Sequence, residues 1–226
     1  MTWRRAVVVG ASGGIGRALS EALEKNGTEV VRLSRSAEGS GRIDLEYEAS
    51  IAQAADSVSD GGDVDLVLVA SGILAPDEIG PEKSWRGIDP AAMARVFAVN
   101  AIGPAMVAKH FVPLLPKDRR SAFAVLGARV GSIGDNRLGG WYSYRASKAA
   151  LAQIVRTLSI ELARTHPLAT CVALHPGTVA TRLSERFARD ATEPDASARH
   201  LLAVLDGLGP DDAGGHFDWK GERIAP

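Results

Sequence analysis

The sequence predicts an α/β protein: a single domain over residues 1–226, with one doubly wound parallel sheet of about seven strands and helices on both faces. Two observations support this fold class. Short, nearly all-apolar runs recur along the chain, as strands buried on both faces of a parallel sheet require. Amphipathic helical patterns fill the gaps between these runs, and no internal repeat or low-complexity linker divides the chain.

The individual elements follow from these patterns. The clear strand runs are 6–9, 29–33, 65–69, 122–126 and 170–174, and weaker ones lie near 42–45 and 216–219. One helix face after the first strand is formed by Ile15, Ala18, Leu19, Ala22 and Leu23. A second, before the strand at 170–174, is formed by Leu151, Ile154, Val155, Leu158 and Leu162. The polar, proline-containing stretches 75–89 and 182–197 are expected to be surface excursions.

Composition excludes several classes of protein. The chain is 46% hydrophobic and 23% charged with a net charge of −1, so no global field draws it to nucleic acid or to an anionic membrane. No run approaches the roughly 20 apolar residues of a membrane-spanning helix, and the apolar stretch 6–9 is too short for a signal peptide. The one cysteine, Cys171, lies in an apolar run and is expected to be buried. We therefore expect a cytoplasmic protein, and the sequence predicts no metal site.

A glycine-rich loop joins the first strand to the first helix. It contains Gly10, Ser12, Gly13, Gly14, Ile15 and Gly16. Glycines let a backbone turn sharply and approach a ligand, and the N–H groups at a helix start favour an anion such as a pyrophosphate. Incidental tight turns also contain glycine clusters. The strand before this loop and the helix after it favour a dinucleotide site.

The end of the second strand bears on the choice of cofactor. An NAD site has an acidic side chain there for the ribose hydroxyls, whereas a 2′-phosphate requires a cation. This chain has no carboxylate at that point and continues with Ser34 and Arg35. A guanidinium binds phosphate through two parallel hydrogen bonds, and a serine adds a donor. The sequence therefore favours NADP(H), although an arginine that is merely solvated in a loop would look the same.

Tyr144 and Lys148 lie four residues apart in an expected helix, so their side chains share one face. A free tyrosine has a pKa near 10 and is a poor proton carrier at neutral pH. A neighbouring lysine favours the phenolate and brings the tyrosine toward its working range. An exposed helix pair would show the same spacing.

Three motifs in order resemble the short-chain dehydrogenase/reductase family over essentially the whole chain. They are Gly10-x-x-x-Gly14-x-Gly16, Tyr144-x-x-x-Lys148, and the run 174–181 that contains Pro176 and Gly177. Residues 131–133 and 139–140 are similar to the small C-factor-like and sniffer-like carbonyl reductases. The glycine loop also fits longer epimerase-like relatives, but the chain is too short for their extra substrate lobe. The resemblance implies a Rossmann-type fold.

The resemblance also implies roles for matching residues. Tyr144 would be the acid/base that protonates a carbonyl oxygen, and Lys148 would lower its pKa and hold the nicotinamide ribose. Asn100 would bend a helix and hold a relay water, although a plain helix-interior asparagine is also consistent. Further cofactor contacts would be Asp44 and Leu45 beside the adenine, Ala70 and Gly72 after the strand at 65–69, and Pro176, Gly177, Val179 and Thr181 near the carboxamide. Asp44 could equally cap a turn.

Two departures from the family pattern leave two function classes open. Residues 69–72 keep only Gly72 of the usual Asn-Asn-Ala-Gly, and Gly127 and Ala128 stand where the family has its active-site serine. The nearest hydroxyl, on Ser132, is either a replacement donor or a loop serine. The chain is thus either an NADP(H)-dependent oxidoreductase for a small carbonyl or alcohol substrate, or a dinucleotide-binding regulatory or signalling protein with weak or lost catalysis.

The long helix also bears on assembly. The resemblance implies a homodimer or homotetramer in which long helices of neighbouring subunits pair. The apolar face at 151–162 would suit this pairing. Core packing explains the same residues.

Overall fold

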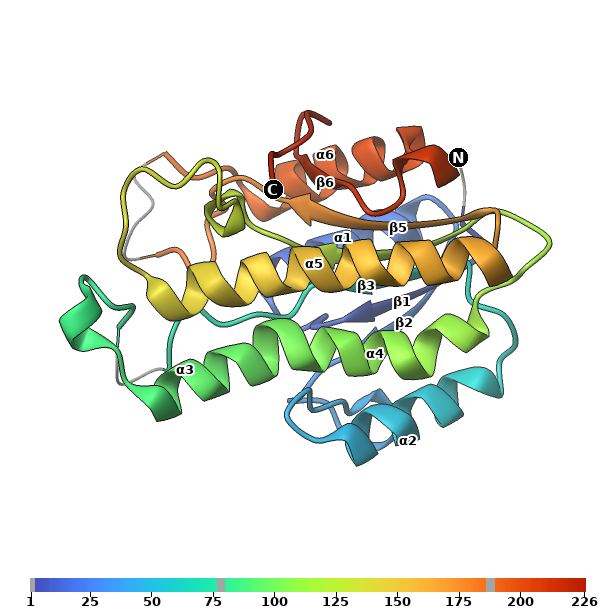
Figure 1. Cartoon of the computed structure of the whole chain (residues 1–226). Helices are drawn as coiled ribbons and strands as arrows, with labels where there is room; N and C mark the ends of the chain where they lie inside the picture. Colours follow the sequence, from blue (N-terminus) through green and yellow to red (C-terminus); the bar gives the residue numbers. More distant parts are fainter. Residues whose placement is uncertain (1–2, 77–79, 186–189) are drawn as a thin grey trace.

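Six parallel strands form the sheet in the computed structural model, which describes residues 3–76, 80–185 and 190–226 (Figure 1). The strands are β1 (Arg5–Val9), β2 (Glu29–Leu33), β3 (Leu66–Val69), β4 (Ser121–Leu126), β5 (Ala169–His175) and β6 (His216–Asp218). Their order is β2-β1-β3-β4-β5-β6, and every neighbouring pair is parallel. The winding reverses between β1 and β3, and the crevice at such a switch point is where open α/β sheets bind ligands.

Helices cover both faces of this sheet, as the sequence predicts. They are α1 (Gly14–Lys25), α2 (Glu48–Ser59), α3 (Pro90–Phe97), α4 (Gly103–Phe111), α5 (Tyr142–Thr165) and α6 (Pro194–Gly207). Figure 1 shows α2, α4 and α5 on one side of the sheet, with α1 and α6 on the other. Two separate apolar layers result, one around Phe111 and Leu151 and the other around Leu19 and Leu201. Cys171 is fully buried in the first layer, as expected.

The strand expected near 42–45 does not form, so the sheet has six strands rather than seven. The chain rejoins β2 only at an isolated bridge between Ser34 and Arg42. The Ile43 N–H donates to Ser34 O at 3.1 Å. The ladder goes no further because the chain turns on both sides of the bridge: the Ala37 N–H donates to Ser34 O at 3.4 Å, and the Tyr47 N–H donates to Asp44 O at 3.2 Å.

The two surface excursions have different outcomes. Residues 77–79 of the first and 186–189 of the second lie outside the described residues. In the first, Trp85 is 61% exposed, in line with the expectation. The second is shorter than predicted, because α6 begins at Pro194 and Ser197 is fully buried. A proline in the first turn of a helix starts that helix rather than breaking it.

One helical stretch is more apolar than the sequence expectation allowed. Residues Pro90–Leu114 contain an 18-residue window with a mean hydropathy of 1.5, long and apolar enough to cross a membrane by length and composition. In the fold this stretch spans α3, a π-helical turn and α4, and its Val107 and Phe111 are fully buried against the sheet. Of the apolar window, 39% is buried inside the fold, so core packing accounts for part of its hydropathy, whereas Ile102 in the same stretch is 54% exposed.

Candidate active site

The glycine loop leaves the start of α1 open to an anion. Gly10 has φ +89°, and a Cβ there would lie 2.9 Å from the backbone N of Ser71. A Cβ on Gly16 would lie 2.2 Å from Gly10 O, so the loop packs against the helix only because both residues are glycine. Gly13 precedes α1 without a side-chain cap, and the first turn has no acidic residue. The free N–H groups there fit a pyrophosphate; Ser12 is exposed and Ile15 half-buried in the same loop.

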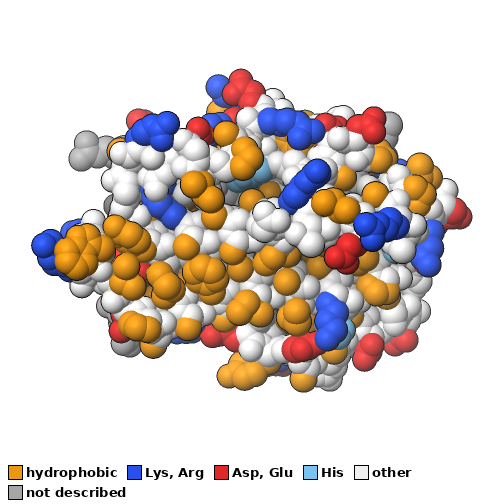
Figure 2. Space-filling model, viewed as in Figure 1, with side chains coloured by type: hydrophobic (Ala, Val, Ile, Leu, Met, Phe, Trp, Pro, Cys, Tyr) orange, Lys and Arg blue, Asp and Glu red, His pale blue; other side chains and the backbone are white. Residues whose placement is uncertain are grey.

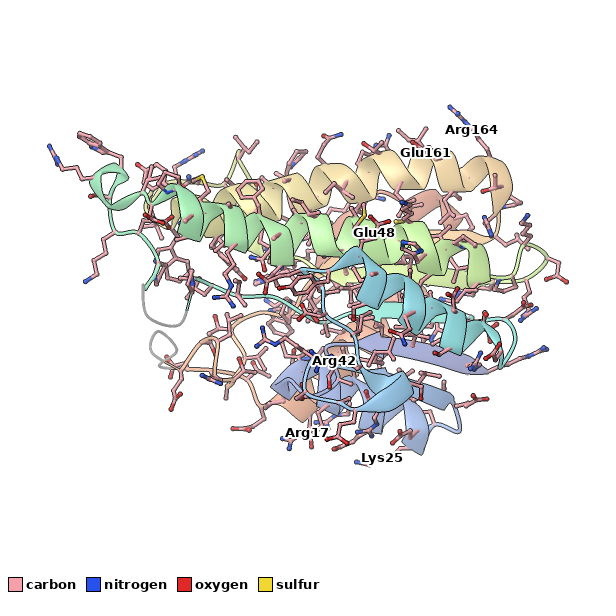
Figure 3. The ribbon with its side chains drawn as sticks, turned by 90° about the horizontal axis from the view of Figure 1, so that it is seen from below. Arg17, Lys25, Arg42, Glu48, Glu161 and Arg164 are labelled. Atoms are coloured by element: carbon pink, nitrogen blue, oxygen red, sulfur yellow. The ribbon has the colours of Figure 1, made fainter. Side chains whose placement is uncertain are left out.

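The residues after β2 place two arginines together. Arg35 is exposed, and the Arg42 Nη1 donates to Arg35 O at 3.2 Å. Ser34 is buried, with its hydroxyl 3.4 Å from Ser36 Oγ. Sequence reasoning missed Arg42, because only the bridge to Ser34 brings it beside Arg35. Figure 3 shows Arg42 and, from α1, Arg17.

The expected adenine contacts are partly occupied within the chain. The Asp44 Oδ1 accepts the Glu46 N–H at 3.1 Å, so this carboxylate caps a turn, which was the alternative interpretation. Leu45 is buried, and a Cβ on Gly103 would lie 2.7 Å from its Cβ. Leu45 therefore packs this loop onto α4.

The residues that directly follow β3 lie at the centre of the candidate site. The Ala70 N–H donates to Val9 O at 2.8 Å and continues the sheet past β3. A Cβ on Gly72 would lie 3.3 Å from Asn100 Oδ1 and 3.6 Å from Lys148 Nζ. Gly72 therefore marks the point where three segments far apart in the sequence converge.

Asn100 lies in the π-helical turn Ala98–Ile102 and is fully buried. Its Oδ1 accepts the Ile73 N–H at 2.9 Å, and its Nδ2 donates to Ile73 O at 2.8 Å and to Ser147 Oγ at 3.1 Å. The expected irregularity of the helix is present, since π-turns widen a helix and often mark functional sites. The Asn100 side chain thus ties the segment after β3 to α5.

Tyr144 and Lys148 are both buried on the inner side of α5. The Lys148 Nζ lies 5.8 Å from the centre of the Tyr144 ring and donates to Leu126 O at 2.7 Å. Burial raises the pKa of Tyr144 to about 12 and lowers the pKa of Lys148 to about 8. A low-dielectric surrounding disfavours each charged form. Lys148 was expected to lower the pKa of Tyr144. Without a bound cofactor, burial has the larger effect and raises that pKa instead.

The loop after β5 closes the site on the glycine loop. Gly177 has φ +77°, and a Cβ there would lie 3.0 Å from Trp219 Cδ1. Pro176 O accepts from Ser197 Oγ at 3.1 Å, and Val179 is buried. A Cβ on Gly14 would lie 2.8 Å from Thr181 Cγ2, so the two loops are in direct contact.

The comparisons with known proteins agree with this geometry. Residues 4–192 match the family described as short chain dehydrogenase. The chain belongs to this family. A dehydrogenase from Rhodococcus named for 1-hydroxy-2-glutathionyl-2-methyl-3-butene is 30% identical over 220 residues, which cover 92% of this chain and 93% of the relative. The C-signal of Myxococcus xanthus is 41% identical over 138 residues, 61% of this chain and 80% of the relative.

Among solved structures, the NADPH-bound carbonyl reductase from chicken fatty liver superposes with a TM-score of 0.87 at 25% identity, covering 100% of this chain and 95% of that one. The expected likeness to small carbonyl reductases is thereby confirmed. Short-chain dehydrogenases are oxidoreductases that use NAD(P)(H), and the uncapped, glycine-lined start of α1 fits such a cofactor.

The short-chain dehydrogenase serine is absent from its usual place, and Ser132 is already hydrogen-bonded. Ala128 is buried. The Ser132 hydroxyl, also buried, donates to Pro226 O at 3.3 Å and accepts the Asp135 N–H at 3.1 Å. Donation to a substrate oxygen would require this hydroxyl to leave Pro226. Its bond to Asp135 would persist.

The sequence analysis missed two half-buried histidines at this edge of the sheet. The Nδ1 of His175, at the end of β5, and the Nε2 of His216, at the start of β6, have no hydrogen-bond partner. A Cβ on Gly127 would lie 2.6 Å from His216 Nε2, so the imidazole occupies the space that a side chain at position 127 would need. Burial lowers the pKa of each histidine to about 4, which keeps both neutral at pH 7.

Proposed function

We propose that this short-chain dehydrogenase is an NADP(H)-dependent carbonyl reductase that interconverts a small carbonyl compound and its alcohol. The observation that carries the proposal is the convergence of Tyr144, Lys148 and Asn100 beside Gly72 and the open start of α1. The bound nicotinamide would supply or accept hydride. The protein would bind, orient and exchange the proton.

Tyr144 is the proposed proton donor to the carbonyl oxygen. Burial holds its phenol protonated far above neutral pH, which is the form that reduction requires. Lys148, with a pKa of about 8, is mostly charged at neutral pH. Its Nζ, close to the tyrosine ring, would favour the phenolate left after proton donation and would bind the nicotinamide ribose. Asn100 would fix the distance between the two segments that carry these groups.

Arg35 and Arg42 support a preference for NADP(H). Two guanidiniums on neighbouring segments give a cationic site for a 2′-phosphate, and no carboxylate stands at the end of β2. The names of similar structures point the same way, since one is an NADPH-bound carbonyl reductase and another is a short-chain dehydrogenase/reductase with bound NADP. The similarity to carbonyl reductases also supports a carbonyl as the substrate.

A regulatory or signalling function is the second candidate. It is favoured by Ala128, which removes the usual hydroxyl from the site, and by the similarity to the C-signal of Myxococcus xanthus. In that case the nucleotide would be bound and turned over slowly.

We also propose a cytoplasmic homodimer or homotetramer. Figure 2 shows hydrophobic side chains gathered over the face that carries α4 and α5. On these elements Ile102, in the turn before α4, is 54% exposed and Ile160, on α5, is 47% exposed. Light scattering of the purified chain tests this assembly.

The deciding experiment is NADPH oxidation with a panel of aldehydes, ketones and quinones. Wild-type turnover supports the reductase, whereas tight NADPH binding without turnover supports the regulatory candidate. With a good substrate, Tyr144→Phe should bind NADPH normally and lose roughly 10²-fold or more in turnover. Lys148→Ala should reduce both turnover and NADPH affinity. Wild-type turnover by Tyr144→Phe would show that Tyr144 is not the acid/base.

A further inference from the structure

The chain enters α5 through an unusual backbone. Gly139 and Gly140 have φ values of +64° and +65°, and Trp141 follows with φ +52°. Trp141 is the one non-glycine residue with positive φ in the described part of the chain. A side chain in this region costs free energy, so surrounding contacts must hold it in place.

Glu82, in the stretch 75–89, supplies those contacts. Its backbone O accepts the Trp141 N–H at 2.6 Å. Its carboxylate accepts the Ser143 N–H, at 3.2 Å to Oε1 and 3.3 Å to Oε2, and also the Ser143 hydroxyl. Trp141 has no side-chain cap for the helix, so Glu82 satisfies N–H groups that the start of α5 leaves open. A carboxylate also interacts favourably with a helix N-terminus.

Arg145 also stabilises the turn formed by residues 139–141. The Arg145 Nε donates to Gly140 O at 3.1 Å, and its Nη1 donates to Val130 O at 3.1 Å. Glu82 and Arg145 thus hold the backbone around Trp141. The Trp141 ring contacts the Tyr144 ring edge-on, with ring centres 6.2 Å apart and planes at 76°. Ser143, which receives the carboxylate, is buried and is the residue directly before Tyr144.

We propose that Glu82 is a positioning residue: it fastens the stretch 75–89 to the first turn of α5 and thereby holds Tyr144 where it can protonate a bound carbonyl. The proposal rests on the proposed reductase function. It also assigns a role to residues 80–89 of this stretch, which Glu82 joins to the start of α5 through both its backbone O and its carboxylate.

The test compares Glu82→Ala, Glu82→Gln and Ser143→Ala with wild type. Glu82→Ala removes the carboxylate, Glu82→Gln keeps an acceptor for the Ser143 groups, and Ser143→Ala removes only the hydroxyl. Glu161→Ala is the matched control, a glutamate exposed near the other end of the same helix (Figure 3). For each variant, kcat, KM, the Kd for NADPH and the solvent deuterium isotope effect on kcat are measured.

Glu82→Ala should lower kcat at least tenfold with an unchanged Kd for NADPH, and raise the solvent isotope effect because proton transfer becomes slower. Glu82→Gln should recover most of the loss, and Ser143→Ala should fall between them. If Glu82→Ala does not fold, the proposal is judged on the other two variants: kcat should be higher in Glu82→Gln than in Ser143→Ala, and the reverse order overturns it. Wild-type kcat in these variants, or a loss shared by Glu161→Ala, overturns the proposal. A wild-type chain that reduces no carbonyl compound overturns the proposed function first, and this proposal with it.

Discussion

Ser132→Ala separates a catalytic hydroxyl from one that only shapes a loop. The wild-type hydroxyl makes two hydrogen bonds, to Pro226 O and from the Asp135 N–H. Each such bond contributes about 1 kcal/mol, so the variant should lose about 1–2 kcal/mol of unfolding free energy in either case. At 3.3 Å the bond to Pro226 is longer than the ordinary O–H···O range, so it is weak and a substrate oxygen could replace it at little cost.

The catalytic effect is larger than the structural one. A donor to a developing oxyanion contributes about 2.7–4 kcal/mol to the barrier, or roughly 10²–10³-fold in kcat. We expect Ser132→Ala to lower kcat about 100-fold. The assay is steady-state NADPH oxidation with the best carbonyl substrate, with urea unfolding of the same protein as the structural control. A stability loss of the stated size together with wild-type kcat would refute the donor role.

Ala128→Ser is the complementary change. It restores a hydroxyl at the position where short-chain dehydrogenases carry their serine. If Ser132 already donates, the second hydroxyl should add little to kcat. A large gain would instead show that the natural site is impaired, and would favour the regulatory candidate.

Two further predictions concern charge. NADPH should bind at least tenfold tighter than NADH, a difference of about 1.4 kcal/mol in binding free energy. Arg35→Ala or Arg42→Ala should weaken the binding of NADPH and leave the binding of NADH unchanged. Equal affinities of the wild-type protein for the two cofactors in a fluorescence titration would contradict this. Burial lowers the pKa of His175 and His216 to about 4 from an ordinary 6.5. As the pH falls, the histidines of the unfolded chain therefore take up protons before those of the folded chain. The free energy of unfolding should be constant above pH 6.5 and should fall by about 3 kcal/mol for each histidine as the pH approaches 4. Urea unfolding should show His216→Gln losing less on acidification than wild type; a flat wild-type profile would disprove the argument.

Local patterns explain what the sequence determines. Strand β4 is buried on both faces and contains only apolar or small residues, and β1 does the same after Arg5, so both runs are visible without a structure. The four-residue spacing of Tyr144 and Lys148 likewise places both side chains on one helix face from local geometry alone. The glycine loop is visible because only glycine tolerates φ near +90° beside another backbone, as Gly10 must.

The sequence predicted two features less well: the extent of one strand and the hydropathy of one helical stretch. The expected strand at 42–45 reduces to one bridge because the chain turns directly after Ser34 and again after Asp44. The apolar stretch Pro90–Leu114 was underestimated because its few charged residues interrupt the sequence without changing the buried face. Both outcomes depend on neighbours that periodicity does not describe.

Only the tertiary structure decided which distant residues meet at the site. Glu82 and Ser143 are 61 positions apart, and Asn100 and Ser147 are 47 apart. Arg42 reaches Arg35 through one bridge, and His216 reaches Gly127 across β5. Such contacts follow from the order of strands in the sheet and the path of the loops. The sequence shows the glycine loop and the Tyr144–Lys148 pair because glycine backbone geometry and helix spacing are local requirements. Which other residues join them at the site is set by packing across the whole chain.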